Sequence, residues 1–287
     1  MTAVGLVGLG NMGSALADNL VDAGLELVTY DRAGAGGSPD GARFRGSVAD
    51  VARAAEVMVL SLPDGDASAA VIAEVLATTD RRVVYIIDTS TVGTSAAHAI
   101  GTELADAGVG YVDAPVSGGA AGARARTLLV MYAARLDVCE AVEPVLAALS
   151  DRRTRVGDRP GMAQAAKLAN NFLSATALAA TSEALALAAS VGVDMATMLD
   201  VLNASSGQNT ATSDKFPNHV LTGRFASGFT NTLMAKDLQL YLAECHAHEQ
   251  PDQLGTVTAE VWQRFAAAMP GADFTRIQPF VAEAGSA

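Results

Sequence analysis

The chain has 287 residues, half of them hydrophobic, and a formal net charge of −12 at pH 7. This length and composition suffice for two globular domains, and the negative charge excludes nucleic acid as an expected partner, because phosphates would be repelled. The two cysteines, Cys139 and Cys245, have neither metal-binding nor redox spacing, which argues against a disulfide framework and favours a cytoplasmic, reducing compartment.

Short apolar runs alternate with helical patterns in the first half of the chain. Such strands, separated by helices, predict a parallel sheet with helices on both faces. Helices are expected from near Asn11, Ala67 and Ser95, and over 137–149. Strands are expected at 3–9, 25–31, 57–62, 83–88, 109–114, 127–133 and 154–157. The basic cluster Arg152, Arg153 and Arg155 is interpreted as a solvated loop.

From about residue 161 the apolar spacing becomes helical nearly to the end of the chain. A helix over 162–191 would span about 45 Å at 1.5 Å per residue, which predicts that it bridges two domains or two subunits. Its apolar part, 172–192, has the length of a membrane span, but the polar residues within it favour a buried helix. Shorter helices are expected at 194–203, 208–221, 230–249 and 253–268. The predicted domains are therefore 1–160 and 161–287.

A glycine-rich turn follows the first predicted strand and opens a helix: Gly8-Leu9-Gly10-Asn11-Met12-Gly13. In this position a G-x-G-x-x-G pattern is typical of a Rossmann domain, where the glycines allow close approach of a pyrophosphate to a helix N-terminus. Asp31 ends the second strand, where a carboxylate can accept hydrogen bonds from the adenosine ribose, and therefore favours NAD. Arg32 leaves NADP open, since it could pair with a 2′-phosphate.

Polar and loop-forming residues also follow later strands. Leu62 and Pro63 end the third strand, and Ser90 and Thr91 follow the fourth, at the edge of the sheet where ligands bind. We expect Leu62, Pro63 and Thr91 to contact the cofactor. Alternatively, Ser90 or Thr91 could cap the next helix.

The fifth strand runs into Ser117-Gly118-Gly119. A serine hydroxyl followed by unshielded backbone N–H groups can hold a substrate carboxylate, although a plain turn is the alternative. No histidine spacing in the sequence is typical of a metal site, so no metal is expected.

Lysine is rare in this chain: only three of the nineteen lysine and arginine residues are lysines. Lysine can gain and lose a proton, whereas arginine stays charged. Lys167 lies on the long predicted helix three and four residues before Asn170 and Asn171, so these side chains can share one face. An ammonium and a carboxamide placed in this way can hold one substrate oxygen, and Lys167 can exchange a proton with it.

Taken in chain order, these motifs resemble the β-hydroxyacid dehydrogenase family, which includes 3-hydroxyisobutyrate dehydrogenase, tartronate semialdehyde reductase and 6-phosphogluconate dehydrogenase. The resemblance extends over nearly the whole chain. It rests on GLGNMG (8–13), DTST (88–91), DAPVSGG (113–119), GMAQAAKLANN (161–171) and FTNTLMAKDL (229–238).

The resemblance implies an α/β fold: an N-terminal Rossmann domain with a doubly wound parallel sheet, joined by a long helix to an all-helical C-terminal domain. It also implies an NAD(P)-dependent enzyme that interconverts a small, anionic β-hydroxyacid and its semialdehyde or ketoacid, and that forms homodimers or homotetramers. By resemblance, Lys167 is the catalytic acid/base and Asn171 orients the substrate. The remaining implied contacts are Ser117, Gly118 and Gly119 with the substrate carboxylate, Lys236 with substrate and cofactor, and Thr91, Phe229 and Asp237 with the cofactor.

Three other functions are alternatives to this one. A tartronate semialdehyde or glyoxylate reductase would use the same groups. An imine reductase would share the scaffold, but Lys167 argues against it because such relatives typically replace this lysine. A catalytically dead scaffold module is disfavoured because Ser117, Lys167 and Asn171 occur together. Two departures from the family pattern, Arg126 in place of a glycine and Ala133-Ala134 in place of a glycine pair, leave the substrate identity open.

Overall fold

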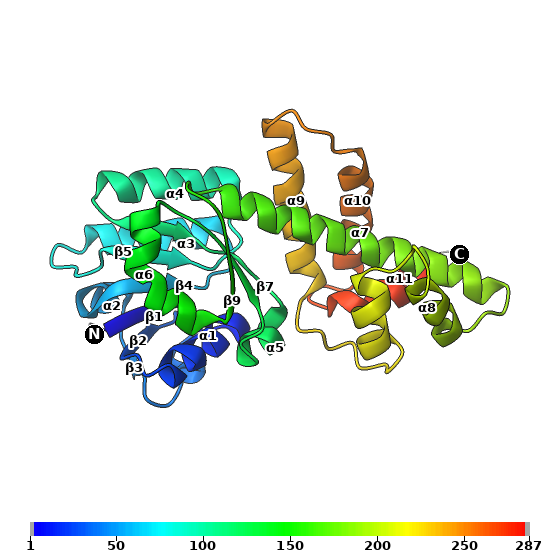
Figure 1. The fold of residues 1–287 in the computed structure, drawn as a ribbon, viewed down its shortest axis with the longest axis horizontal. Helices are drawn as coiled ribbons and strands as arrows, with labels where there is room; N and C mark the ends of the chain where they lie inside the picture. The colour runs from blue at the N-terminus through cyan, green and yellow to red at the C-terminus, as the bar shows by residue number, and fades with distance from the viewer. Residues whose placement is uncertain (1–2, 285–287) are drawn as a thin grey trace. The chain divides into compact units, whose positions relative to one another are not determined.

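The computed structural model describes residues 3–284, so the outermost residues of the two predicted domains, 1–2 and 285–287, lie outside the described residues. The chain forms two compact units, Met1–Lys167 and Leu168–Ala287 (Figure 1). They divide within one continuous helix, α7 (Met162–Ser190). The division predicted after residue 160 stays a prediction.

Within residues 3–284, the strands of the N-terminal unit form one nine-stranded sheet in the order β3-β2-β1-β4-β5-β6-β8-β7, with β9 paired to β8. The strands are β1 (Ala3–Val7), β2 (Leu27–Tyr30), β3 (Arg43–Phe44), β4 (Ala55–Leu60), β5 (Tyr85–Asp88), β6 (Gly110–Asp113), β7 (Val116–Ser117), β8 (Leu129–Ala133) and β9 (Arg152–Gly157). The strands from β3 through β2, β1, β4 and β5 to β6 are parallel to their neighbours. Strand β8 is antiparallel to β6 and β7. The strand order reverses between β1 and β4, which confirms a doubly wound sheet with an antiparallel addition at one edge.

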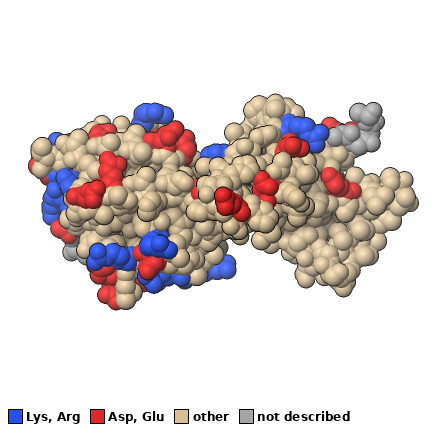
Figure 2. All heavy atoms as spheres, turned by 90° about the horizontal axis from the view of Figure 1, so that it is seen from above, with Lys and Arg blue, Asp and Glu red and all other residues tan. Residues whose placement is uncertain are grey.

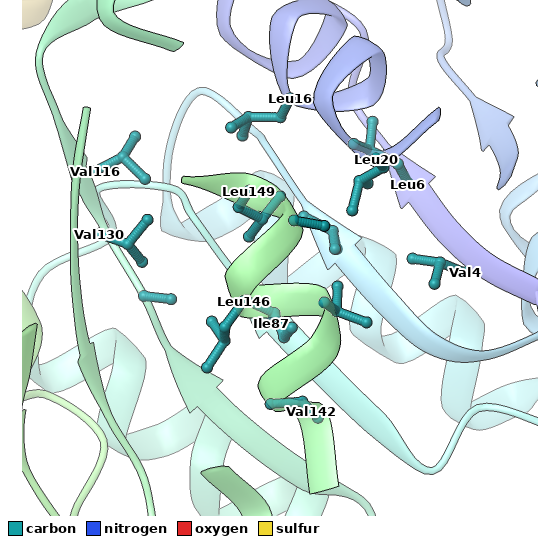
Figure 3. Packing of buried hydrophobic residues seen from close by; sticks show 14 of the residues in the cluster. Val4, Leu6, Leu16, Leu20, Ile87, Val116, Val130, Val142, Leu146 and Leu149 are labelled. Carbon is teal, nitrogen blue, oxygen red and sulfur yellow. The ribbon is translucent and has the colours of Figure 1, made fainter. Parts of the chain in front are cut away.

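Helices cover both faces of this sheet: α1 (Asn11–Asp22), α2 (Val48–Ala54), α3 (Gly65–Ala77), α4 (Thr94–Asp106), α5 (Gly119–Arg124) and α6 (Leu136–Leu149). On one face, Leu16 of α1 and Leu146 of α6 pack with Leu6 and Ile87 of the strands (Figure 3). Helices α2, α3 and α4 enclose a second cluster on the other face. Since β1 is buried along its whole length, its sequence is an unbroken apolar run.

The C-terminal unit is helical and packs around three fully buried aromatic rings, Phe216, Trp262 and Phe265. Its elements after α7 are α8 (Met195–Asn203), η2 (Ala211–Val220), α9 (Asn231–Ala247), α10 (Gln253–Ala268), η3 (Phe274–Arg276) and α11 (Ile277–Ala284). The segment predicted as a helix over 208–221 is a π-helix, η2. Among the described residues, α7 is the one helix that is long and apolar enough to span a membrane by length and composition.

The interpretation of Arg152, Arg153 and Arg155 as a solvated loop is wrong, because these residues form strand β9 and pair in parallel with β8. An edge strand can keep charged side chains in solvent while its backbone pairs with the sheet. Arg153 donates to the carbonyl of Ser150 and to Glu143, and Arg155 donates to the carbonyl of Ala134. The charges therefore flank a paired backbone instead of marking a loop.

Candidate active site

Two glycines of the loop after β1 are required by backbone packing. Gly8 has a φ of +98°, and a Cβ on it would lie 2.2 Å from the carbonyl oxygen of Ser61 after β4. A Cβ on Gly13 would lie 1.8 Å from the carbonyl oxygen of Gly8. These approaches hold the start of α1 against the ends of β1 and β4, where the strand order reverses.

Gly10 differs from both of them, because nothing in the described structure requires a glycine there. A Cβ on Gly10 would meet no atom within 4 Å, and its φ of −66° is open to any residue. The residue is exposed and directly precedes α1. Open space in front of a helix N-terminus fits the approach of an anionic pyrophosphate. The loop Gly8–Gly13 therefore fits a dinucleotide.

The carboxylate of Asp31 is held against this loop. Its Oδ2 accepts the N–H of Leu9 at 2.5 Å, and its Oδ1 accepts the N–H of Ala33 at 2.7 Å. The fold thus brings the end of β2 to the glycine loop, as the sequence motif requires. Arg32, next in the chain, is exposed.

The loops after β4 and β5 are also joined. The N–H of Leu62 donates to Ser90 Oγ at 2.9 Å, while Pro63 is exposed and Thr91 is half-buried. Helix α4 begins at Thr94 after Gly93. The alternative role of Ser90 or Thr91 as a helix cap stays a prediction. Together with Gly8 and Asp31, these residues place the expected cofactor contacts of the N-terminal unit at the carboxyl edge of the parallel strands.

Asp113 and Gln164 form a buried polar connection that sequence reasoning missed. Asp113 Oδ2 accepts the N–H groups of Gly161, Ala163 and Gln164 at 2.9, 3.1 and 3.2 Å, which fixes the first turn of α7 to the end of β6. The Nε2 of Gln164 donates to Asp113 Oδ1 at 2.7 Å. The signals in the sequence were a carboxylate at the end of an apolar strand and a glutamine one turn before Lys167.

Burial dominates the electrostatics of this connection. It raises the pKa of Asp113 to about 6, against the opposing hydrogen bonds from Gln164 and Gly161. Burial also raises the pKa of Asp88, at the end of the neighbouring strand β5. The hydroxyl of Tyr111 lies 3.5 Å from Asp88, and its pKa is raised well above the usual value by burial and by the two carboxylates.

Lys167 is buried, with 7% of its surface exposed, one turn along α7 from Gln164.

The carboxylate-binding loop predicted from the sequence lies after β6. Ser117 ends β7, and Gly118 and Gly119 follow with φ of +135° and +67°. A Cβ on Gly118 would lie 3.0 Å from Leu128 Cα, so this turn needs a small residue. All these residues belong to the N-terminal unit.

The C-terminal unit assembles a second group of predicted site residues. The Nδ2 of Asn171, which is buried on α7, donates to Asp237 Oδ2 of α9 at 2.6 Å. The Nζ of Lys236 lies 3.2 Å from Asp237 Oδ1. Asn170 is exposed, and its Nδ2 donates to Asn171 Oδ1 at 3.1 Å. Asn171, Lys236 and Asp237 therefore form one polar cluster, in which Asn171 and Asp237 are buried and Lys236 is half-buried.

Phe229 precedes α9 and contacts the core of the C-terminal unit. Its ring packs edge-on against Phe274 with 5.8 Å between ring centres, and its carbonyl accepts the N–H of Phe274 at 2.8 Å. Within residues 3–284, no group of three His, Cys, Asp or Glu side chains is placed to hold a metal ion.

The two departures from the family pattern have different structural settings. Arg126 adopts a φ of +57°, a conformation that favours glycine. Its guanidinium donates to the carbonyls of Ala147 and Ala148 and pairs with Asp151 at 2.9 Å. These contacts offset the cost of the left-handed backbone, roughly 1–2 kcal/mol. Ala133 and Ala134 are both buried.

Models of known families match both parts of the chain. Residues 3–157 match the NAD binding domain of 6-phosphogluconate dehydrogenase. Residues 161–280 match a domain described as the NAD-binding domain of NADP-dependent 3-hydroxyisobutyrate dehydrogenase.

Individual relatives extend the likeness over the whole chain. The 2-(hydroxymethyl)glutarate dehydrogenase of Eubacterium barkeri is 35% identical over 83% of this chain and 81% of its own. The 3-hydroxyisobutyrate dehydrogenase of Pseudomonas aeruginosa is 33% identical over 97% of this chain and 98% of its own. An imine reductase from Myxococcus stipitatus, at 19% identity and a TM-score of 0.67 over 98% of this chain and 99% of its own, shares the fold.

A solved structure agrees with these relatives. The 3-hydroxyisobutyrate dehydrogenase of Mycobacterium tuberculosis, solved with L-serine, superimposes with a TM-score of 0.91 at 30% identity, over 98% of this chain and 99% of its own. The resemblance and the fold class inferred from the sequence are thereby confirmed. This chain belongs to the β-hydroxyacid dehydrogenase family and is an NAD(P)-dependent dehydrogenase of the 3-hydroxyisobutyrate dehydrogenase type.

Proposed function

We propose that the chain interconverts a small β-hydroxyacid and its semialdehyde or ketoacid with Lys167 as the catalytic acid/base. The observation that carries the proposal is the buried ammonium of Lys167 on α7, one turn before the buried amide of Asn171. A bound nicotinamide cofactor supplies or accepts the hydride. During oxidation Lys167 acts as a neutral amine whose Nζ takes the hydroxyl proton. During reduction its ammonium gives a proton to the carbonyl oxygen.

Asn171 orients the same substrate oxygen. Since an ionised carboxylate only accepts hydrogen bonds, the contact with Asp237 determines which end of the Asn171 amide carries the N–H groups. The amide therefore keeps one orientation through the reaction. The Nζ of Lys236, 3.2 Å from Asp237 Oδ1, supports this arrangement.

The substrate carboxylate binds at Ser117, Gly118 and Gly119. The positive φ of both glycines supports this role, because such a turn leaves backbone N–H groups accessible for an anion. The hydroxyl of Ser117 adds one further donor. A carboxylate held by several donors places the hydroxyl-bearing carbon at a set distance from this loop.

Two substitutions test the role of Lys167. Lys167→Ala removes the ammonium, whereas Lys167→Arg keeps the positive charge but cannot release a proton. We expect both to lower kcat by roughly 10²–10⁴-fold, the usual contribution of general acid–base catalysis, while NADH binding measured by fluorescence stays intact. Retention of more than about a tenth of kcat by Lys167→Ala would contradict the role, because the loss would fall short of this range.

NAD is the proposed cofactor, in preference to NADP. The carboxylate of Asp31, held by the N–H groups of Leu9 and Ala33, supports this choice, because it would repel a 2′-phosphate. The ratio of kcat/KM for the two cofactors measures the preference. A preference for NADP of about tenfold, or 1.4 kcal/mol, would show that Arg32 decides the specificity.

A substrate panel separates the alternative activities. We expect turnover with small β-hydroxyacids such as 3-hydroxyisobutyrate, 3-hydroxypropionate, glycerate, threonate or serine, followed by nicotinamide absorbance. Reduction of tartronate semialdehyde or glyoxylate alone would favour the reductase alternative. Reduction of cyclic imines without any hydroxyacid turnover would overturn the proposal.

We also propose a homo-oligomer in a reducing, cytoplasmic compartment. Large areas of the C-terminal unit bear no charged side chain on the face seen in Figure 2, and Leu173 and Leu187 of α7 are 65% and 70% exposed. Exposed leucines on one long helix support association between copies. Cys139 and Cys245 are free and buried, which supports a reducing compartment. Light scattering after gel filtration would give the mass, and a monomer would contradict the oligomer.

A further inference from the structure

The amide of Gln164 uses both of its ends to join α7 to the loop after β5. Its Nε2 donates to the carbonyl of Ser90 at 3.1 Å and to Asp113 Oδ1 at 2.7 Å. Its Oε1 accepts the N–H groups of Val92 at 2.9 Å and Gly93 at 3.2 Å. The side chain is fully buried. An amide bonded at both ends can neither flip nor swing away without leaving buried polar groups unpaired.

This amide lies between two segments with proposed functions. Thr91, a proposed cofactor contact, stands between Ser90 and Val92, and Gln164 bonds to the backbone of both. Lys167 follows Gln164 by three residues on α7, which is about one helical turn. The first turn of α7 is itself held by Asp113. The position of the lysine relative to the loop after β5 therefore depends on a short, buried chain of hydrogen bonds.

We propose that Gln164 is a positioning residue, which sets the place of the Lys167 ammonium relative to the loop that carries Thr91. The proposal rests on the acid/base role of Lys167 and extends it. Gln164 itself touches backbone groups and Asp113, and it exchanges no proton with substrate. Its effect on the reaction is geometric: an error of about 1 Å in the position of a reacting group can lower a rate by 10²-fold.

Two substitutions separate positioning from general stability. Gln164→Leu removes all four hydrogen bonds at similar volume. Gln164→Glu keeps an acceptor for Val92 and Gly93 but turns an oxygen toward Asp113 Oδ1 and the carbonyl of Ser90. Two acceptors face each other there unless the introduced carboxyl or Asp113 is protonated. Asp88 and Tyr111 interact with Asp113 in this buried network, and the titratable Lys167 is buried one turn further along α7.

The kcat values of the two variants should depend on pH in different ways. Gln164→Leu should lower kcat by on the order of 10- to 100-fold at every pH. Gln164→Glu should approach the kcat of the unsubstituted protein near pH 6, where the introduced carboxyl and Asp113 can share one proton. Above the pKa of that shared proton, its kcat should fall about tenfold per pH unit. Turnover of 3-hydroxyisobutyrate and thermal unfolding would be measured for both variants over the same pH range.

A constant loss of activity by Gln164→Glu across the pH range would overturn the inference, as would nearly full kcat in Gln164→Leu. If Gln164→Leu does not fold, the pH profile of Gln164→Glu alone decides. Lys167→Ala, measured in parallel, separates the two proposals. An active Lys167→Ala removes the acid/base role, whereas an inactive one beside unaffected Gln164 variants removes only the positioning role.

Discussion

Gly10 and Gly13 make a matched pair for testing the cofactor site, because each would gain the same methyl group in a different environment. On Gly13 the new carbon would lie 1.8 Å from the carbonyl oxygen of Gly8, so the backbone would have to move by roughly 1 Å. Such overpacking costs about 1–3 kcal/mol or more. On Gly10 the new carbon would meet nothing within 4 Å.

Gly10→Ala should therefore leave the fold intact. The gain from a stiffer unfolded chain, about 0.4–1 kcal/mol, is offset by the weaker helix cap that alanine provides. The methyl would instead occupy the path of the pyrophosphate. Loss of one hydrogen bond to a charged group, about 1.5–3 kcal/mol, corresponds to a roughly 10- to 100-fold weaker Kd for NADH.

The assay combines fluorescence titration with NADH and denaturant unfolding of both variants. Gly13→Ala should lose stability, whereas Gly10→Ala should lose NADH affinity at unchanged stability. If Gly10→Ala binds NADH as tightly as the unsubstituted protein, the open space before α1 is not where the phosphates lie. If Gly13→Ala keeps full stability, the close approach to Gly8 is not a constraint of the fold.

Two further predictions concern stability. The folded pKa of Asp113 is raised to about 6, so the folded protein holds this proton more tightly than the unfolded chain. Its contribution to the free energy of unfolding then falls as pH rises from about 4 to about 6. Asp113→Asn should make unfolding in urea less dependent on pH over that interval, and an unchanged slope would refute the assignment. Trp262→Ala should cost about 3–5 kcal/mol, because the ring is fully buried and its Nε1 donates to the carbonyl of Ala175. A loss below about 1 kcal/mol in the same assay would show that the core collapses around the gap.

The sequence by itself determined the fold class and the family. Unbroken apolar strands such as β1 alternate with helices, and the motif at Gly8–Gly13 occupies the position in that order that is typical of a dinucleotide site. These features are readable because they are local: a strand buried on both faces must be apolar, and a tight turn must contain glycine. The rarity of lysine directed attention to Lys167 for a similarly local reason, since only lysine of the two long cationic side chains releases a proton readily.

Other features depended on contacts between distant segments. The sequence predicted a strand at 154–157 and marked Arg152, Arg153 and Arg155 as solvated charges. Pairing with β8 shows that the strand already begins at Arg152. Gly10 and Gly13 look alike in the motif. Only the surrounding atoms show that Gly13 is required by packing against Gly8, whereas Gly10 faces open space that a ligand could enter.

The tertiary structure alone decided what surrounds the proposed catalytic groups. Asp113 and Gln164 are 51 residues apart, and Asn171 and Asp237 are 66 apart. No local pattern pairs residues at such separations, because the pairing follows from how the sheet and the helices pack. The sequence therefore identified Lys167 and Asn171 as candidates, and the fold supplied the buried hydrogen bonds to neighbouring residues that hold Asn171 and the first turn of the helix carrying Lys167.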